Sequence, residues 1–251
     1  MNSQIQIDAF KKADLKAKIH EKNLKHLILE KFSKSNIDYK YIDKIKNYIK
    51  DKSYITTMVP IITNKDAKQR NIFEIFIENP KLKNIFEISN NTDLLLRKKA
   101  EDLLFVKAYT NCDASLRPKY GSINLIENIM GDELCKMYGE ICLKYKQDIK
   151  KRTTFTFGDS FTFMMYLCTY NYFEHILYHF DTNTLNSIIN LIDNNNNNIK
   201  LYQYIEAQIH GDVDISTDIE SISISKKLYE KNIDIINKFI NKYKNIDILV
   251  Y

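Results

Sequence analysis

The chain has 251 residues, 44% of them hydrophobic, and a formal net charge of +5. This length is enough to bury a full core in one domain, and it argues against two large domains. No stretch is long and apolar enough for a membrane helix, and the amino terminus carries charge where a signal peptide needs apolar residues. We therefore expect no membrane partner, and a protein that is cytoplasmic or delivered into a host cytosol.

The charges and cysteines narrow the function classes further. Lysines alternate with acidic residues along the chain, which is typical of a solvated surface. The positive charge and the 17 tyrosines leave a nucleic-acid binder as an alternative, but no recognised nucleic-acid motif is present, so we expect no nucleic-acid partner. The four cysteines form no CxxC pair and have no zinc-type spacing, which predicts free thiols and no metal site.

The chain begins with helix-forming sequence. In residues 4–33, apolar side chains recur at intervals of three and four positions between charged ones, which predicts an amphipathic helix. A second helix is predicted over residues 39–50. Because neither segment has a strand signal, residues 1–52 are predicted to form a helical N-terminal segment outside an α+β domain of residues 53–251.

The next segments mix strand and helix signals. Residues 54–63 are rich in β-branched side chains and predict the first strand of the core. Apolar runs rich in Ile and Phe predict further strands at residues 71–78 and 83–89. Residues 92–109 are charged and rich in leucine, and they are predicted to form a helix that Thr92 caps.

The second half carries the clearer strand signals. Strands are predicted where apolar residues alternate or nearly alternate, at residues 121–126, 139–144, 153–157 and 201–209. The remaining predictions are helices within 163–181 and 227–244, a polar loop at 193–198, and a terminal strand paired within the sheet at 245–251. Separate helical and strand-rich regions indicate the α+β class, with a mixed or antiparallel sheet core.

Glycine is scarce in this chain. It occurs five times, and four of the five lie in short segments that also carry polar side chains, at Gly121, Gly139, Gly158 and Gly211. Glycine is needed where φ is positive or where the backbone approaches a ligand closely, so these four are predicted to mark a site. Ordinary turns are the alternative explanation.

Two of these segments place polar groups next to a predicted strand. Residues 117–121 (RPKYG) enter one strand, and Arg117 and Lys119 could face a phosphate, since Arg offers a planar fork of donors. A loop with exposed bases is the alternative. Residues 153–160 (TTFTFGDS) end another strand, so Asp159 is either a site carboxylate or the acceptor of a turn-type bond to nearby backbone.

Residues 204–211 (YIEAQIHG) are the most specific segment. In a strand, the period of two places Glu206, Gln208 and His210 on one face. Three polar groups on one face of an otherwise apolar strand are expensive to bury without a purpose, so this face is predicted to line a cleft. The alternative is an edge strand with its polar side in water.

A pair of histidines, His175 and His179, lies four positions apart, which would place both on one face of a helix. Two ligands do not make a zinc site, and no HExxH order is present. We interpret them as core or surface histidines.

From about residue 109 to the end, the chain resembles a bacterial family known only as a domain of unknown function. The resemblance rests on RPKYG, a glycine-led strand, TTFTFGDS and YIEAQIHG, in this order, followed by a short apolar strand like NIDILVY. That family is similar in turn to the CteC-like ubiquitin-modifying ADP-ribosyltransferases, distant relatives of the poly(ADP-ribose) polymerase fold that use an Asp and a Glu as a catalytic pair.

The resemblance implies a mono-ADP-ribosyltransferase that takes NAD as its substrate and modifies a protein acceptor, with a ubiquitin threonine as one candidate; we expect a monomer. Glu206 would be the catalytic carboxylate, because cleavage of the bond to nicotinamide passes through an oxocarbenium-like state that a carboxylate stabilises. Asp66 or Asp159 would supply the second carboxylate. The positions expected to bind NAD are Arg117, which would hold the diphosphate, with Tyr120, Gln208, His210 and Ser89.

The first half departs from that family's pattern. Where the family has a His-Pro-Asp-Arg-like turn after its first core strand, this chain reads IITNKDAK, which leaves Asp66 without a neighbouring His or Arg. A Glu-Thr-Gly-like turn followed by Ser-Asn remains only as EISN at residues 87–90, without its glycine. Nicotinamide binding normally depends on these positions. A protein-binding module that keeps the fold without the chemistry is therefore the alternative function.

Overall fold

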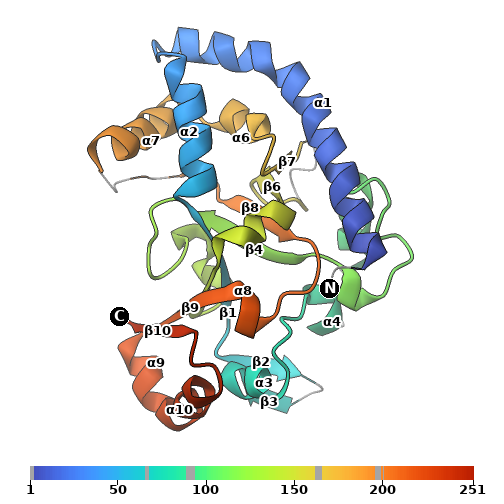
Figure 1. Ribbon diagram of the computed structural model, residues 1–251, viewed down its shortest axis with the longest axis vertical. Coiled ribbons are helices and arrows are strands. Elements are labelled where there is room, and N and C mark those ends of the chain that lie inside the picture. The colour runs from blue at the N-terminus through green and yellow to red at the C-terminus, as the bar shows by residue number, and fades with distance from the viewer. Residues whose placement is uncertain (1–2, 66–67, 89–93, 162–165, 196–198, 200) are drawn as a thin grey trace.

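The structure of the protein, a computed structural model, describes residues 3–65, 68–88, 94–161, 166–195, 199 and 201–251 (Figure 1). The predicted α+β class is confirmed, since a mostly antiparallel sheet is combined with helices and follows a long N-terminal helix. None of the helices in these ranges is both long and apolar enough to cross a bilayer.

The elements carry the labels of Figure 1. The helices within the described residues are α1 (Gln4–Lys34), α2 (Lys40–Asp51), α3 (Ile72–Glu78), α4 (Ile85–Ile88), α5 (Leu94–Leu104), α6 (Glu174–His179), α7 (Thr182–Asn194), α8 (Ile215–Asp218), α9 (Lys226–Lys231) and α10 (Ile233–Lys242), with short 3-10 helices η1 (Ala114–Leu116), η2 (Glu133–Tyr138) and η3 (Gln147–Arg152). The strands are β1 (Tyr54–Val59), β2 (Ile62–Lys65), β3 (Lys68–Asn71), β4 (Lys119–Asn124), β5 (Ile141–Tyr145), β6 (Thr153–Phe157), β7 (Cys168–Thr169), β8 (Ile205–Ile209), β9 (Ile219–Ile224) and β10 (Asp247–Val250).

Eight strands of the described residues form one sheet in the order β10-β9-β5-β1-β4-β8-β6-β7, and β2 and β3 form a separate ribbon. Neighbouring strands of the large sheet are antiparallel except for β9 and β10, which run parallel. In Figure 1, α1, α2, α6 and α7 lie towards one end of the molecule, and α3, α9 and α10 lie towards the other with the ribbon. The sheet therefore stands between two groups of helices.

The two predicted N-terminal helices are confirmed as α1 and α2. Helix α1 begins at a capping box, in which the Ser3 amide donates to Gln6 Oε1 at 2.8 Å and the Gln6 amide donates to the Ser3 hydroxyl at 3.4 Å. Leu24 and Phe32 of α1 and Ile45 of α2 are buried in the same apolar cluster as the strands. The domain boundary at residue 52 stays a prediction, but the helices share their core with the sheet.

Two strand predictions in the first half are wrong. Residues 72–78 form helix α3, whose buried side chains Ile72, Phe73, Ile75 and Phe76 follow a helical and not an alternating period. The Asn71 side chain caps α3 by accepting from the Phe73 amide at 2.9 Å. Residues 85–88 form helix α4, which Asn84 caps in the same way. Short apolar runs do not distinguish strand from helix, and the capping asparagines carried the better signal.

Most predictions for the second half are confirmed. Strands β4, β5, β6, β8 and β10 lie at or near the predicted positions, and β10 is ordered by its pairing with β9. The helix predicted within 163–181 is wrong in extent over its described part, because Cys168–Thr169 pairs with β6 and the helix begins only at Glu174. Residues 163–165 lie outside the described residues. The helix predicted over 227–244 is divided at Asn232 into α9 and α10. Helix α7 and strand β9 were not predicted.

The predicted helix at 92–109 is confirmed over Leu94–Leu104, and its proposed cap, Thr92, lies outside the described residues. The loop predicted at 193–198 falls partly on α7 and partly outside the described residues.

Strands β1 and β4 pair only at one end, and this fork in the sheet positions the site. Their register runs from Tyr54 opposite Asn124 to Thr56 opposite Ser122 and then stops. Beyond that point β1 continues against β5, and β4 continues against β8. At the start of the fork, the Thr57 hydroxyl donates to the Tyr120 carbonyl at 2.9 Å. The two strands thus separate inside the sheet without either losing its outer partner.

Gly121→Ala is expected to lower the free energy of unfolding by about 1–3 kcal/mol, measured by urea denaturation. A Cβ at this position would lie 2.6 Å from the Thr56 carbonyl oxygen and 2.7 Å from the Thr57 hydroxyl oxygen. The matched control is Ser221→Ala on β9, which removes a buried hydroxyl that has no hydrogen-bond partner among the described residues, so its effect should be near zero. Equal stability of Gly121→Ala and the parent would contradict the close contact.

Candidate functional site

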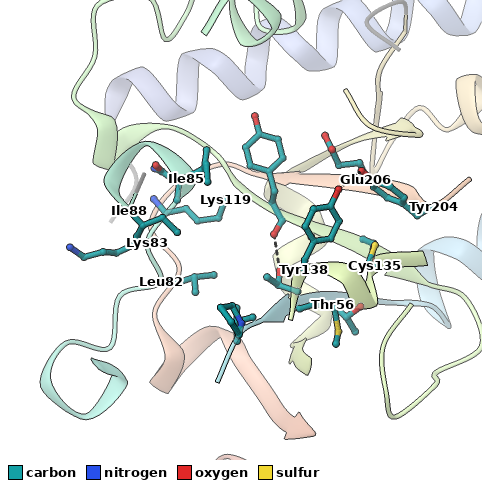
Figure 2. A pocket seen from close by; sticks show the side chains of 18 of the residues that line it. Thr56, Leu82, Lys83, Ile85, Ile88, Lys119, Cys135, Tyr138, Tyr204 and Glu206 are labelled. Atoms are coloured by element: carbon teal, nitrogen blue, oxygen red, sulfur yellow. Dashed lines mark hydrogen bonds between the residues drawn. The ribbon is translucent and has the colours of Figure 1, made fainter. Parts of the chain in front are cut away.

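A cavity of about 280 Å³ opens in the fork between β1 and β4. Its walls come from both strands, from α4 and the chain before it, and from η2. Figure 2 shows Glu206 and Tyr204 at one end of the cavity and Lys83, Ile85 and Ile88 at the other. The volume is close to the lower limit for small-molecule sites, and mostly apolar walls with a few converging polar groups are typical of such sites.

The catalytic candidate Glu206 lies on β8, which pairs with β4 on one side and β6 on the other. The alternative prediction, that this segment is an edge strand whose polar face is exposed to solvent, is therefore wrong. Glu206 is 5% exposed, Gln208 is 0% exposed and His210 is 1% exposed. Glu206 alone of the three lines the cavity. The sheet thus holds one carboxylate at the wall of a cavity, in a position where burial has to be compensated by hydrogen bonds.

Burial raises the pKa of the Glu206 carboxyl to about 7 from an ordinary value of 4.5. Hydrogen bonds from Ser160 and Gln208 act in the opposite direction, as does the positive charge of Arg97. The negative charge of Asp159 adds to the effect of burial. Near neutral pH, Glu206 is therefore close to the midpoint between its acid and its carboxylate, which is characteristic of groups that carry chemistry.

Glu206→Gln is expected to raise the free energy of unfolding by about 3 kcal/mol at pH 8, with no gain near pH 4.5. Because the folded-state pKa is above the unfolded value, the native state favours the protonated carboxyl. The parent therefore loses stability as the pH rises from about 4.5 to 7, and it stays at the lower level above pH 7. The variant has a neutral amide in place of the carboxyl and would escape this loss. Urea denaturation of both proteins across this pH range measures the difference.

The matched control is Glu220→Gln on β9, whose carboxylate is 41% exposed and paired with Lys144. Removing a half-exposed ion pair changes stability by roughly 1 kcal/mol or less and should leave no such pH-dependent gain. A Glu206→Gln protein that is less stable than the parent at pH 8 would show that the carboxylate is well solvated or fully compensated.

Four other predicted residues reach the cavity: Lys119, Tyr120, Gly121 and Asp159. Asp159 lies at its wall, and its Oδ1 also accepts from the Phe161 amide at 2.9 Å, so the turn-type bond and the site position both occur. Tyr120 also lines the cavity, while its hydroxyl donates to Glu101 Oε1 at 2.7 Å. Asp159, Tyr120 and Glu206 are therefore brought together around one space.

Arg117 is not brought to the cavity. Its guanidinium is 2% exposed and forms an ion pair with Glu101, and its Nη2 donates to the Tyr109 carbonyl at 2.7 Å. It also stacks over the Phe86 ring, 4.6 Å from the centroid. The alternative prediction, an exposed loop, is therefore wrong for Arg117, because its guanidinium is buried and donates to Glu101 and to the Tyr109 carbonyl.

The remaining predicted residues divide into those that are placed elsewhere and those that cannot be placed. Gln208 and His210 share the predicted face with Glu206 but do not line the cavity. Asp66 and Ser89 lie outside the described residues. Gly158 and Gly211 have positive φ values of 84° and 91°. The alternative explanation, that these glycines serve ordinary turns, therefore fits both.

The histidines of EHILYH lie within the described residues. His175 is 3% exposed and its Nε2 accepts from the Phe157 amide at 3.3 Å, which confirms a core role. Among the residues that the structure describes, no three His, Cys, Asp or Glu side chains gather as metal ligands.

Several cavity residues were missed from the sequence, among them Lys83, Arg97 and Tyr204. Arg97 of α5 lines the cavity and lies over the rings of Tyr120 and Phe161, with centroids 5.4 and 5.6 Å away. No local motif marks it, because only the tertiary contact of α5 side chains with Tyr120 of β4 brings it there. Tyr204 also lines the cavity, and its hydroxyl lies 3.4 Å from that of Tyr138. It is the first residue of YIEAQIHG, so that motif did contain the signal.

A family model described as "Protein of unknown function (DUF3626)" matches residues 59–203. That range contains Arg97, Tyr120 and Asp159 and ends just before β8. No curated protein matches the chain.

Proposed function

The chain belongs to the family described as "Protein of unknown function (DUF3626)", a name that states no activity, and we propose that it is a mono-ADP-ribosyltransferase with NAD as its substrate and Glu206 as its catalytic carboxylate. The proposal combines the motif resemblance of the second half with the chemistry of the cavity in the fork.

The observation that carries the proposal is the position of Glu206. A carboxyl group on an interior strand, 5% exposed and at the wall of a cavity, is held where its charge is costly, and burial raises its pKa to about 7. Its Oε1 accepts from Gln208 Nε2 at 2.8 Å, so one oxygen is fixed in place. A fixed carboxylate with little water around it stabilises a developing positive charge more strongly than one in solvent.

The proposed reaction needs such a group. The bond from ribose C1′ to the nicotinamide nitrogen breaks, its electron pair leaves with nicotinamide, and positive charge develops on the ribose. Glu206 would accept a hydrogen bond from a ribose hydroxyl and stabilise that charge. The acceptor oxygen then bonds to C1′ and releases its proton, for which Asp159, at the wall of the same cavity, is the proposed base.

The rest of the cavity has groups that suit the remainder of NAD. Lys83, Arg97 and Lys119 line it, and they supply positive charge for a diphosphate. The apolar side chains of Ile85 and Ile88 offer contact area for an aromatic ring of NAD. On this proposal, Lys83 holds the diphosphate in place of Arg117, because Lys119 Nζ already donates to the Ser115 carbonyl at 2.8 Å.

The acceptor is proposed to be a protein hydroxyl, and a ubiquitin threonine is the candidate that the resemblance implies. The rim of the cavity has exposed apolar side chains that suit a protein surface: Ile88 is 49% exposed and Tyr138 is 49% exposed, and the neighbouring Met137 is 81% exposed. Aromatic side chains and methionine are enriched at protein interfaces.

The test is incubation of the purified chain with NAD labelled on its adenylate, first with ubiquitin and then with a host lysate. Label transferred to a protein band, together with release of nicotinamide, is the expected result. If NAD is hydrolysed but no protein band is labelled, the catalytic role of the cavity is supported and the tested proteins are excluded as acceptors.

A protein-binding module without chemistry is the second candidate, and a specific observation favours it. Arg117, the predicted diphosphate ligand, has protein partners for its guanidinium, and the first-half motifs depart from the resembling family. If NAD neither binds, as judged by a thermal shift, nor turns over, this second function replaces the first.

A further inference from the structure

A row of buried polar side chains runs along the sheet from Glu206 to Tyr109, which follows α5 in the chain. Gln208 Nε2 donates to Glu206 Oε1 at 2.8 Å, and Thr154 Oγ1 donates to Gln208 Oε1 at 2.8 Å. Thr154 Oγ1 also lies 3.1 Å from His210 Nε2, and His210 Nδ1 lies 2.7 Å from the Tyr109 hydroxyl. Each of these side chains is at most 5% exposed, so the protein itself must satisfy their hydrogen bonds.

The direction of every bond in this row follows from its first member. A carboxylate oxygen can only accept, so the Gln208 amide must turn its nitrogen towards Glu206 and its oxygen towards Thr154. The single Thr154 hydroxyl proton is then donated to Gln208, so His210 Nε2 must carry a proton and donate to Thr154. His210 Nδ1 is left as an acceptor, and the Tyr109 hydroxyl donates to it.

The second Gln208 proton fits the same assignment. Gln208 Nε2 also lies 2.9 Å from Thr156 Oγ1, and the Thr156 hydroxyl donates to the Gly158 carbonyl at 3.1 Å. No donor faces a donor and no acceptor faces an acceptor in the set. A chain of bonds that all point the same way polarises its members and strengthens each bond.

We infer that Tyr109, His210, Thr154 and Gln208 form a one-way hydrogen-bond relay that positions Glu206 and stabilises its ionised form. Gln208 and His210 are thereby positioning residues and not NAD ligands. Only the catalytic role of this relay rests on the proposed function. Its geometry and its effect on the Glu206 carboxyl do not depend on any reaction.

The surroundings keep the relay in one state. Burial lowers the pKa of His210 to about 3, with the positive charge of Arg152 acting in the same direction, so the imidazole stays neutral and retains one donor and one acceptor. Phe10 of α1 and Phe105 pack edge-on against its ring at 5.7 and 4.9 Å between centroids. The far end is fixed because Arg117 donates to the Tyr109 carbonyl.

Other groups around Glu206 contribute to its titration and must stay constant in a test. Arg97 of α5 and Asp159 after β6 carry the nearby charges, and Ser160 donates a hydrogen bond. Tyr120 of β4 and Tyr204 before β8 are neutral, because burial raises the pKa of both phenols. The variants below leave all five unchanged.

The experiment is a titration of the Glu206 carboxyl by NMR in protein labelled with ¹³C-glutamate, with the resonance assigned by its absence in Glu206→Gln. Thr154→Val removes the donor to Gln208 and should raise the midpoint by about one pH unit. His210→Phe should raise it by less, and Tyr109→Phe, which removes only one oxygen, should raise it least. His210→Gln retains a donor and an acceptor and should restore most of the parent value.

Phe105→Leu is the control, because it alters packing against the His210 ring without touching a hydrogen bond. Its midpoint should equal that of the parent. A midpoint that is the same in Thr154→Val, Tyr109→Phe and the parent would overturn the relay, and so would an equal shift in Phe105→Leu. If the parent protein does not turn over NAD, the proposed function is rejected. The NMR titration of Glu206 still tests the relay, because it does not depend on turnover.

Discussion

Glu206→Gln is expected to reduce NAD turnover by about a hundredfold or more, measured as nicotinamide release at pH 8. The substitution preserves the size of the side chain and its hydrogen bond from Gln208 but removes the charge that would stabilise the oxocarbenium-like state. Because the pKa of Glu206 is about 7, turnover by the parent should rise with pH through neutrality and level off once the carboxylate is fully formed.

Glu220→Gln is the control for this loss, since Glu220 lies on the same sheet but is not among the residues that line the cavity. It should turn over NAD at the parent rate. If Glu206→Gln also matched the parent while remaining folded, Glu206 would not be the catalytic group, and the enzymatic assignment of this site would be abandoned.

Arg117→Met is expected to lower the free energy of unfolding by about 3–5 kcal/mol, measured by urea denaturation at pH 7. The guanidinium is 2% exposed and the Glu101 side chain is 1% exposed, so removing the cation leaves a carboxylate buried without its charge partner. The Tyr109 carbonyl also loses a donor at 2.7 Å. A ligand-binding arginine at the surface of a cavity would give a far smaller change.

The double variant Arg117→Met with Glu101→Gln separates the ion pair from simple packing. The amide that replaces the Glu101 carboxylate would be neutral and could still accept from the Tyr120 hydroxyl, so most of the lost stability should return. If the double variant were as unstable as the single one, loss of the uncompensated charge would not be the cause. In that case the stacking of the guanidinium over the Phe86 ring would be the stabilising contact.

The sequence by itself determined the local pattern of the site. Glu206, Gln208 and His210 alternate with Ile205, Ala207 and Ile209, and a strand has only one way to arrange that alternation. The same reasoning predicted α1 from its apolar period, and it failed for residues 72–78 because a short apolar run satisfies both periods until a cap such as Asn71 decides.

Tertiary structure alone decided which polar groups face the cavity. Whether the polar face of β8 is wet or buried depends on β4 and β6, which are distant in sequence and pair with β8 on both sides. Arg117 pairs with Glu101 and Arg97 reaches the cavity because α5 lies beside β4, where both α5 side chains contact Tyr120. A motif specifies which donors are available, but their partners depend on contacts between distant segments, which no local period encodes.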